Sequence, residues 1–240
     1  MSALRDRGLD SQARGIRDFT RPYLDRRNRR DNEQMRLLMA FVLADDSSCV
    51  DVGSNRGEML IDMVRIAPRG HHIAFEPLPE LHQHLLAAFP SADIRQVALG
   101  STIGRQTFTR AIDDPGLSGL RIHAYGRPMR TEEFEVEVST LDASLPTGFS
   151  PRLIKIDVEG GEVQVLMGGQ ETISKYRPIV VFEHQKVSAP FYGTGPSDVF
   201  EFFTRLHMRI FDMDGVGPYS LADLEEAYVT RRMWNFIAHD

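Results

Sequence analysis

The sequence predicts a doubly wound α/β fold, with a mostly parallel sheet and helices on both of its faces. Stretches with strand-like and helix-like patterns alternate after about residue 33, which is typical of βαβ units. Short groups of glycine, proline and aspartate separate these stretches. The chain has 240 residues, of which 42% are hydrophobic, and this suffices for one domain with its own core. We therefore expect an arm over 1–32 and a single domain over 33–240.

The first half of the predicted domain alternates between the two patterns. Helical spacing of apolar residues predicts helices over 33–43, 57–67 and 80–89. Apolar runs bounded by turn residues predict strands over 48–53, 71–77 and 92–99. Alternating polar and apolar residues predict further strands over 104–112 and 133–141, with an irregular stretch at 113–132 between them.

The second half repeats this order. Buried strands are predicted over 152–160 and 178–185, and between them a helix over 162–176 that breaks near Gly168 and Gly169. A further helix is predicted over 197–207, with Ser197 as its N-cap. The segments 208–215 and 231–240 are predicted to close the sheet as a final pair of strands.

The charge is unevenly distributed along the chain. The formal net charge is −6, yet the first 30 residues carry nine arginines against four aspartates, a local +5 that leaves −11 for the rest. A basic arm could meet a phosphate-bearing substrate, RNA or an anionic surface. However, aspartates interrupt it and no aromatic residues alternate with the arginines for base stacking. We expect a solvated leader and no nucleic-acid partner.

Cysteine content and hydrophobicity limit the cellular compartments in which the protein is expected. Cys49 is the only cysteine, which excludes an intrachain disulfide and a zinc site made of cysteines. The N-terminus lacks the apolar core of a secretory signal, and no stretch approaches the ~18 apolar residues that span a bilayer. We therefore expect a cytoplasmic protein without a membrane span, and leave the oligomeric state open.

The stretch "CVDVGSNRGE" (49–58) lies at the end of the first predicted strand, where doubly wound folds bind cofactors. The dinucleotide fingerprint G-x-G-x-x-G needs its second glycine to admit a pyrophosphate, and that position is Asn55 here. The Gly-Lys-Ser/Thr run of a P-loop is also missing. The turn therefore favours a cofactor without phosphates over NAD, and its candidate residues are Asp51, Gly53, Ser54, Asn55 and Gly57.

Glu76 is the second sign of a nucleoside. It follows Gly53 by 23 residues, about where an acid holds the ribose hydroxyls in such folds. Leu78 could pack on the adenine ring. A nucleoside without phosphates in an acidic site points to S-adenosylmethionine, whose sulfonium is a cation. The other interpretation is an ordinary strand-to-helix turn with an exposed glutamate.

Six blocks of the chain resemble the FkbM family of S-adenosylmethionine-dependent methyltransferases. In order, and over roughly residues 47–186, they are "DVGSNRG", "FEPLP", "VALG", "STLD", "IKIDVEGGEVQVLMGG" and "VVFEH". The resemblance implies a Rossmann-like class I methyltransferase fold, whose seven-stranded sheet has an antiparallel last strand. It also implies methylation of a hydroxyl on a sugar, glycolipid or natural product. We assign Ala98, in the third block, and Asp157, in the fifth, to the cofactor site.

A base that removes the acceptor's hydroxyl proton would support methyl transfer. Asp157 and Glu159 are predicted at the end of one buried strand, and Glu183 and His184 at the end of the next. His184 is the natural base near neutral pH, and Glu159 and Asp157 are the alternatives. All four could hold Mg²⁺, but no D-x-D spacing or second histidine supports a metal, so none is predicted.

The acceptor pocket should form from segments that overhang these strand ends. The stretch 113–132 offers polar side chains, and the loop after His184 offers an aromatic wall; these are Arg121, His123, Tyr125, Arg127 and Arg130, then Phe191 and Tyr192. This mixture suits a small polar acceptor, anionic ones included. An RNA methyltransferase and a non-catalytic nucleoside-binding module are the alternative functions.

Overall fold

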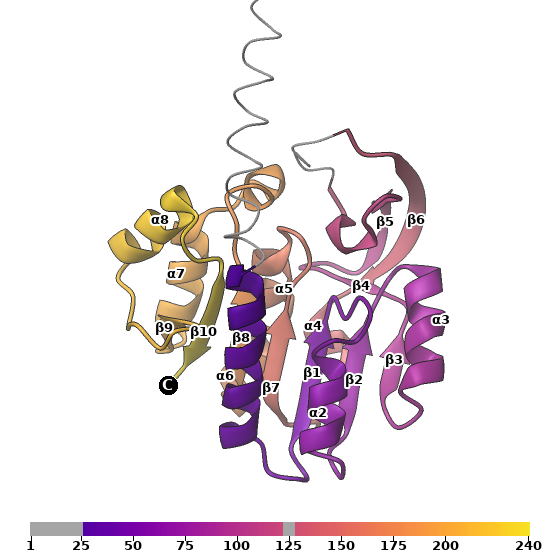
Figure 1. Cartoon of the computed structure of the whole chain (residues 1–240), viewed down its shortest axis with the longest axis horizontal. Coiled ribbons are helices and arrows are strands. Elements are labelled where there is room, and N and C mark those ends of the chain that lie inside the picture. The colour runs from indigo at the N-terminus through magenta and orange to yellow at the C-terminus, as the bar shows by residue number, and fades with distance from the viewer. Residues whose placement is uncertain (1–25, 122–127) are drawn as a thin grey trace, which may run out of the picture.

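The computed structural model describes residues 26–121 and 128–240, whose strands form two sheets (Figure 1). The main sheet has seven strands in the order β3-β2-β1-β7-β8-β10-β9, and the smaller sheet has three in the order β4-β6-β5. In the main sheet β10 is antiparallel to β8 and β9, and the other neighbouring pairs are parallel. The predicted fold class and the antiparallel last strand are therefore confirmed.

The strands of the main sheet are three to six residues long, and those on its inside are apolar because both faces of the sheet are covered. They are β1 (Ser48–Val52), β2 (His72–Phe75), β3 (Asp93–Arg95), β7 (Pro151–Ile156), β8 (Ile179–Glu183), β9 (Arg209–Asp212) and β10 (Asn235–His239). The smaller sheet consists of β4 (Ala98–Leu99), β5 (Gly104–Ala111) and β6 (Thr131–Ser139).

Helices cover both faces of the main sheet. One face packs against a helix over residues 26–42, α2 (Leu60–Ile66) and α3 (Pro79–Ala88). The other packs against α4 (Leu141–Ser144), α5 (Glu162–Gly168), α6 (Gln170–Tyr176), α7 (Pro196–Arg205) and α8 (Leu221–Thr230). Two 3₁₀ turns, η1 (Pro115–Leu117) and η2 (Ala189–Tyr192), lie in loops. Within the described ranges, no helix has the length and hydrophobicity that crossing a bilayer requires.

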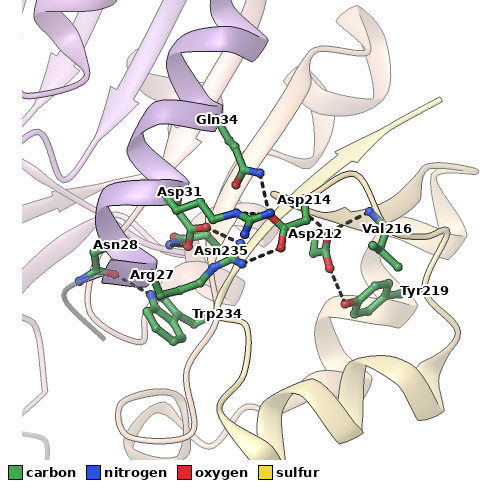
Figure 2. A network of polar contacts seen from close by, with 11 residues as sticks. Arg27, Asn28, Asp31, Gln34, Asp212, Asp214, Val216, Tyr219, Trp234 and Asn235 are labelled. Carbon is green, nitrogen blue, oxygen red and sulfur yellow. Dashed lines mark hydrogen bonds and ion pairs between the residues drawn. The ribbon is translucent and has the colours of Figure 1, made fainter. Parts of the chain in front are cut away.

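The helix over 26–42 is joined to the C-terminal part of the chain by a polar network (Figure 2). Arg27 lies 2.5 Å from Asp31 and 2.7 Å from Asp214, which follows β9. Asn235 of β10 donates a hydrogen bond of 2.9 Å to Asp31. This helix crosses residue 32, where the sequence predicts the end of the arm. The division into 1–32 and 33–240 stays a prediction, because residues 1–25 lie outside the described part of the chain.

The strand predicted over 92–99 is wrong as one element, because the chain passes there from one sheet to the other. β3 pairs with β2 as far as Arg95, whereas Ala98 and Leu99 pair with β6. The buried residues of the segment also belong to different clusters, since Ile94 packs below α3 and Ala98 packs with the smaller sheet. The residues of one apolar run therefore pack in two separate hydrophobic clusters.

Helix boundaries differ in detail from the sequence prediction. α7 begins at Pro196 after Gly195, whose N–H donates to Asp198, so Ser197 lies inside the helix and is not its N-cap. The predicted break near Gly168 and Gly169 is confirmed, because α5 ends at Gly168 and α6 begins at Gln170. α8 has no counterpart among the predicted elements.

Candidate functional site

The carboxyl ends of four parallel strands lie in register. Val52 of β1 pairs with Phe75 of β2 and Ile156 of β7, and Ile156 pairs with Phe182 of β8. The next residue of each strand therefore belongs to one row along the edge of the sheet, in the order Glu76, Gly53, Asp157 and Glu183. This edge is where doubly wound folds bind ligands, and the row contains the main residues predicted from the sequence.

The turn after β1 is fixed by close approach of the backbone. Gly53 has a φ of +75°, and a Cβ on it would lie 1.9 Å from the carbonyl oxygen of Asp157. The N–H groups of Gly53 and Ser54 both donate to the carbonyl oxygen of Phe75, which ties the turn to β2. Asn55 also adopts a positive φ, of 48°. Only glycine fits at position 53, whatever ligand the turn holds.

Glu76 faces this turn. Its carboxylate accepts hydrogen bonds of 2.9 Å from the backbone N–H groups of Asn55 and Leu78, and the residue is only 5% exposed. Burial raises the pKa of Glu76 to about 7, although the two backbone donors act in the opposite direction. Each carboxylate oxygen keeps further lone pairs, so Glu76 can still accept ligand hydroxyls.

Lys155 connects the turn to the row of acids, and the sequence analysis did not single it out. Its ammonium group donates to the carbonyl oxygen of Gly53 at 2.9 Å and lies 3.4 Å from both Asp51 and Asp157. Burial alone would lower the pKa of Lys155, but the carboxylates of Asp157 and Asp51 raise it above its ordinary value. The sequence feature that could have pointed to Lys155 is a single lysine within the apolar run "LIKI".

Three carboxylates meet at the β7 and β8 end of the row. One oxygen from each of Asp157, Glu159 and Glu183 lies within 4.8 Å of the other two. Burial raises the pKa of both Glu159 and Glu183 well above the ordinary range, and the charge of Asp157 raises it further. Glu162 orients the loop that carries Glu159, because its Oε1 accepts hydrogen bonds from the N–H groups of Val158 and Gly160.

A cavity of about 810 Å³ lies over this edge of the sheet and brings most of the predicted residues together. The predicted residues that line it are Asp51, Gly53, Ser54, Asn55, Glu76, Leu78, Ala98, Asp157 and Glu159. Gly57 does not line the cavity; it lies in the turn with a φ of +82°, and a Cβ there would overlap the ring of Phe89. Arg56 is exposed and also lies outside the lining.

His184 is not brought to the cavity. His184 is only 1% exposed, and its ring stacks on Tyr228 of α8 at a centroid distance of 5.1 Å. Burial lowers the pKa of His184 to about 4. Alternation along β8 and beyond directs Glu183 toward the cavity and leaves His184 among the helices, so the geometry favours a packing role for His184.

The predicted acceptor side chains are only partly assembled. Arg121, Phe191 and Tyr192 line the cavity, whereas Arg130 is exposed and pairs with Asp113. His123, Tyr125 and Arg127 lie outside the described residues.

One wall of the cavity was missed by the sequence analysis. It comes from the helix over 26–42, through Asn28, Asp31, Asn32 and Met35, and from Asn235 at the start of β10. Asn235 pairs with Glu183 across the two strands, so it extends the row of polar residues by one position.

The order of the main sheet, with the antiparallel β10 between β8 and β9, is that of class I methyltransferases, and the cavity lies at the ligand-binding edge of this fold. The family model described as the methyltransferase FkbM domain matches residues 51–210, two thirds of the chain. The chain therefore belongs to the FkbM methyltransferase family. The match extends beyond residue 186, where the sequence resemblance ends, and includes α7.

Solved structures agree with this fold. A methyltransferase FkbM from Methylobacillus flagellatus KT aligns with a TM-score of 0.52 at 16% identity, over 82% of this chain and 44% of that one. This chain thus spans less than half the length of that protein. The plantazolicin methyltransferase BpumL, solved with a pentazolic desmethylPZN analog and SAH, aligns with a TM-score of 0.50 at 9% identity, over 96% and 93% of the two chains. A comparison with curated proteins gave no significant match.

Proposed function

We propose that this methyltransferase uses S-adenosylmethionine to methylate a hydroxyl group of a small acceptor, such as a sugar, a glycolipid or a natural product. The observation that carries the proposal is the in-register row of Glu76, Gly53, Asp157 and Glu183 on one cavity wall. The row supports the proposal because Glu76, at one end, would bind the nucleoside and the carboxyl groups at the other end would accept a proton, in a chain of a methyltransferase family.

The residues of the cavity fit this cofactor. Glu76 would hold the ribose hydroxyls, Leu78 and Ala98 would contact the adenine, and the turn at Gly53 would contact the methionine part. When bound, S-adenosylmethionine supplies an electrophilic methyl group on a sulfonium that leaves as a neutral thioether. A cation of this kind suits the cavity, because eight of the side chains that line it are carboxylates and two, Lys155 and Arg121, are basic.

The acid-rich end of the cavity would receive the acceptor. Asp157, Glu159 and Glu183 lie beside the turn at Gly53, so an acceptor hydroxyl placed there meets carboxylate oxygens that can orient it and accept its proton. Phe191 and Tyr192 of η2 would bound the acceptor on its other side. Orientation of the two reactants supplies much of the rate in such a displacement, on the order of 7–11 kcal/mol in favourable cases.

The same excess of carboxylates argues against an RNA acceptor. A phosphate backbone binds through lysine and arginine side chains, and it would be repelled by a cavity lined by eight acids and two bases. The arginines that suggested RNA mostly precede residue 26 and lie outside the described part of the chain. We therefore favour an uncharged or cationic hydroxyl compound over the anionic acceptor that the sequence also allowed.

Two measurements test this function. Calorimetry should show binding of S-adenosylmethionine and S-adenosylhomocysteine, and no binding of NAD at the same concentrations. Mass spectrometry should then find a product heavier by one methyl group in place of a hydrogen, in a panel of sugars, glycolipids, polyketides and RNA, and a methyl-labelled cofactor should shift that product by the mass of the label. Preference for NAD would overturn the proposal. Tight cofactor binding without a product from any acceptor in the panel, RNA included, would favour a binding module.

A further inference from the structure

We propose that Asp157, Glu159 and Glu183 form a binding site for a divalent cation of the magnesium or manganese type. Asp157 and Glu159 follow β7 and Glu183 ends the neighbouring β8, and one oxygen of each lies within 4.8 Å of the other two. Oxygens on opposite sides of a Mg²⁺ or Ca²⁺ ion are separated by about 4 to 5 Å, twice the usual metal–oxygen distance. The present spacing is close to that of a metal site, and small shifts of the side chains would bring all three oxygens to one central ion.

Glu183 gives an independent reason for a ligand at this point. The residue is 9% exposed, and its Oε2 is buried without a hydrogen-bond partner among the described residues. No ion pair joins Glu183 to a basic side chain in the same part of the chain. A side-chain hydrogen bond from Gln185 lowers the pKa of Glu183, but Oε2 keeps no partner among the described residues. A buried carboxylate oxygen without a partner is costly, and the side chain of Glu183 lies against Asp157 and Glu159 on the cavity wall. A bound cation would satisfy this oxygen.

The nearby lysine does not balance the charge of the cluster. Lys155 pairs with Asp51 and Asp157, and its third interaction is with the carbonyl oxygen of Gly53. Its single charge is thus shared between two acids, one of which, Asp51, lies outside the cluster. Glu162 adds another buried carboxylate close by, with its Oε2 also unpartnered among the described residues. One ammonium group thus lies beside three carboxyl groups of the cluster, and a divalent ion would hold these groups together.

The ligand atoms of the cluster favour one type of ion. The three described ligands are all carboxylate oxygens, which favours hard cations over zinc or copper, and His184 does not line the cavity. The remaining coordination positions would face the cavity, where water or an acceptor hydroxyl can occupy them. This role rests on the proposed function: the ion would bind the acceptor oxygen directly, lower the pKa of its hydroxyl and orient it, and the proton would pass to bulk water.

Titration of the metal-free protein with Mn²⁺ alone tests the site. Calorimetry, together with the loss of the free Mn²⁺ electron paramagnetic resonance signal, should show one ion per chain. Glu183→Gln should weaken binding ~10-fold or more, since even the loss of a group behind a metal ligand costs about that much. Glu159→Gln should act in the same way. Glu58→Gln is the matched control, because Glu58 lines the same cavity outside the cluster, and it should leave the affinity unchanged.

The outcomes separate this inference from the proposed function. Absence of Mn²⁺ binding below about 1 mM, a limit that marks weak sites, would overturn the cation site. Equal affinity in the wild type and in Glu183→Gln would overturn it as well. Binding of S-adenosylmethionine is measured separately in EDTA, because Glu76 and the glycine turn need no metal. Failure of that binding would overturn the proposed function, whatever the result with Mn²⁺.

Discussion

Arg27, near the start of the first described helix, donates a hydrogen bond of 2.7 Å to Asp214, which lies 187 residues further along the chain (Figure 2). The same guanidinium pairs with Asp31, which is 3% exposed. Arg27→Met would leave Asp31 buried without its cation, so we expect a loss of about 3–5 kcal/mol in the free energy of unfolding. Urea denaturation at pH 7 measures this loss.

An exposed pair with the same sequence spacing provides the control. Arg205 and Glu201 lie 2.9 Å apart on the outside of α7, also four residues apart. Arg205→Met should change the free energy of unfolding by less than ~1 kcal/mol, because such pairs are solvated. The double change Arg27→Met with Asp31→Asn should recover much of the loss from Arg27→Met. Equal losses in the two single arginine variants would show that burial of the Arg27 pair does not contribute to the free energy of unfolding.

Gly53→Ala should abolish detectable binding of S-adenosylmethionine. The new Cβ would lie 1.9 Å from the carbonyl oxygen of Asp157, so β1 and β7 could not keep their present spacing at the cavity. Gly148→Ala is the control that distinguishes the effect of this close contact from the effect of backbone strain at a positive φ. Gly148 has a φ of +80°, close to that of Gly53, but a Cβ there has nothing within 4 Å. We expect Gly148→Ala to cost only ~1–2 kcal/mol of stability and to leave cofactor affinity unchanged.

Cofactor affinity should rise with pH between 6 and 8. The pKa of Glu76 is raised to about 7, chiefly by burial, and the nearby charges act on it in opposite directions, Lys155 lowering and Asp51 raising it. Only ionised Glu76 accepts from both ribose hydroxyls, so affinity should fall by at most ~10-fold for each pH unit below 7. Glu76→Gln should weaken binding ~10-fold at pH 8 and flatten this dependence. Calorimetry at several pH values measures both effects.

Stability should show the opposite pH trend. A carboxyl whose pKa is raised in the folded state binds more protons there than in the unfolded chain, so its contribution is lost as pH rises from about 4.5 through 7. Glu76→Gln removes this term. The free energy of unfolding of the variant, relative to the wild type, should therefore increase over this interval. A constant difference between pH 5 and 8 would contradict the raised pKa.

His184→Ala should affect stability and leave the cofactor site intact. Loss of a buried ring stacked on Tyr228 should cost ~2 kcal/mol or more. Cofactor affinity should not change, and methyl transfer measured well below the melting temperature should stay within a few-fold of the wild type. A fall of 100-fold or more in kcat, with unchanged affinity, would instead support His184 as the general base.

The sequence allowed the sheet and half of the site to be predicted because those signals are local. Apolar strands end in "DVGSNRG", "FEP" and "IDVEG", and the register of parallel strands then brings Gly53, Glu76 and Asp157 together. The role of Lys155 was missed because a lysine within an apolar strand has no fixed meaning until its neighbours are known. Asn28 and Asp31 could not be assigned either, since they accept hydrogen bonds from Trp234 and Asn235, about 200 residues further along the chain.

The side of the sheet that His184 faces could not be predicted from the sequence, for a different reason. Neighbouring residues at a strand end point to opposite sides of the sheet, so Glu183 and His184 could not both face one cavity. Which of the two does so depends on where the apolar residues of β8 pack, and both faces of that strand are buried. A strand that is apolar throughout carries no alternation to decide the question.

The segment matched by the family model, residues 51–210, does not coincide with a stable physical unit. A fragment trimmed to these limits would lose most of β1, all of β10 and the helix over 26–42. β8 would then present unpaired backbone groups on one side, while Met59, Leu60 and Met63 of the opposite layer would lose Met35 and Met39 as neighbours. Such a fragment should aggregate through its open strand edge. Expression and domain-exchange experiments on this chain therefore need the helix over 26–42 and β10 together with the segment that the family model matches.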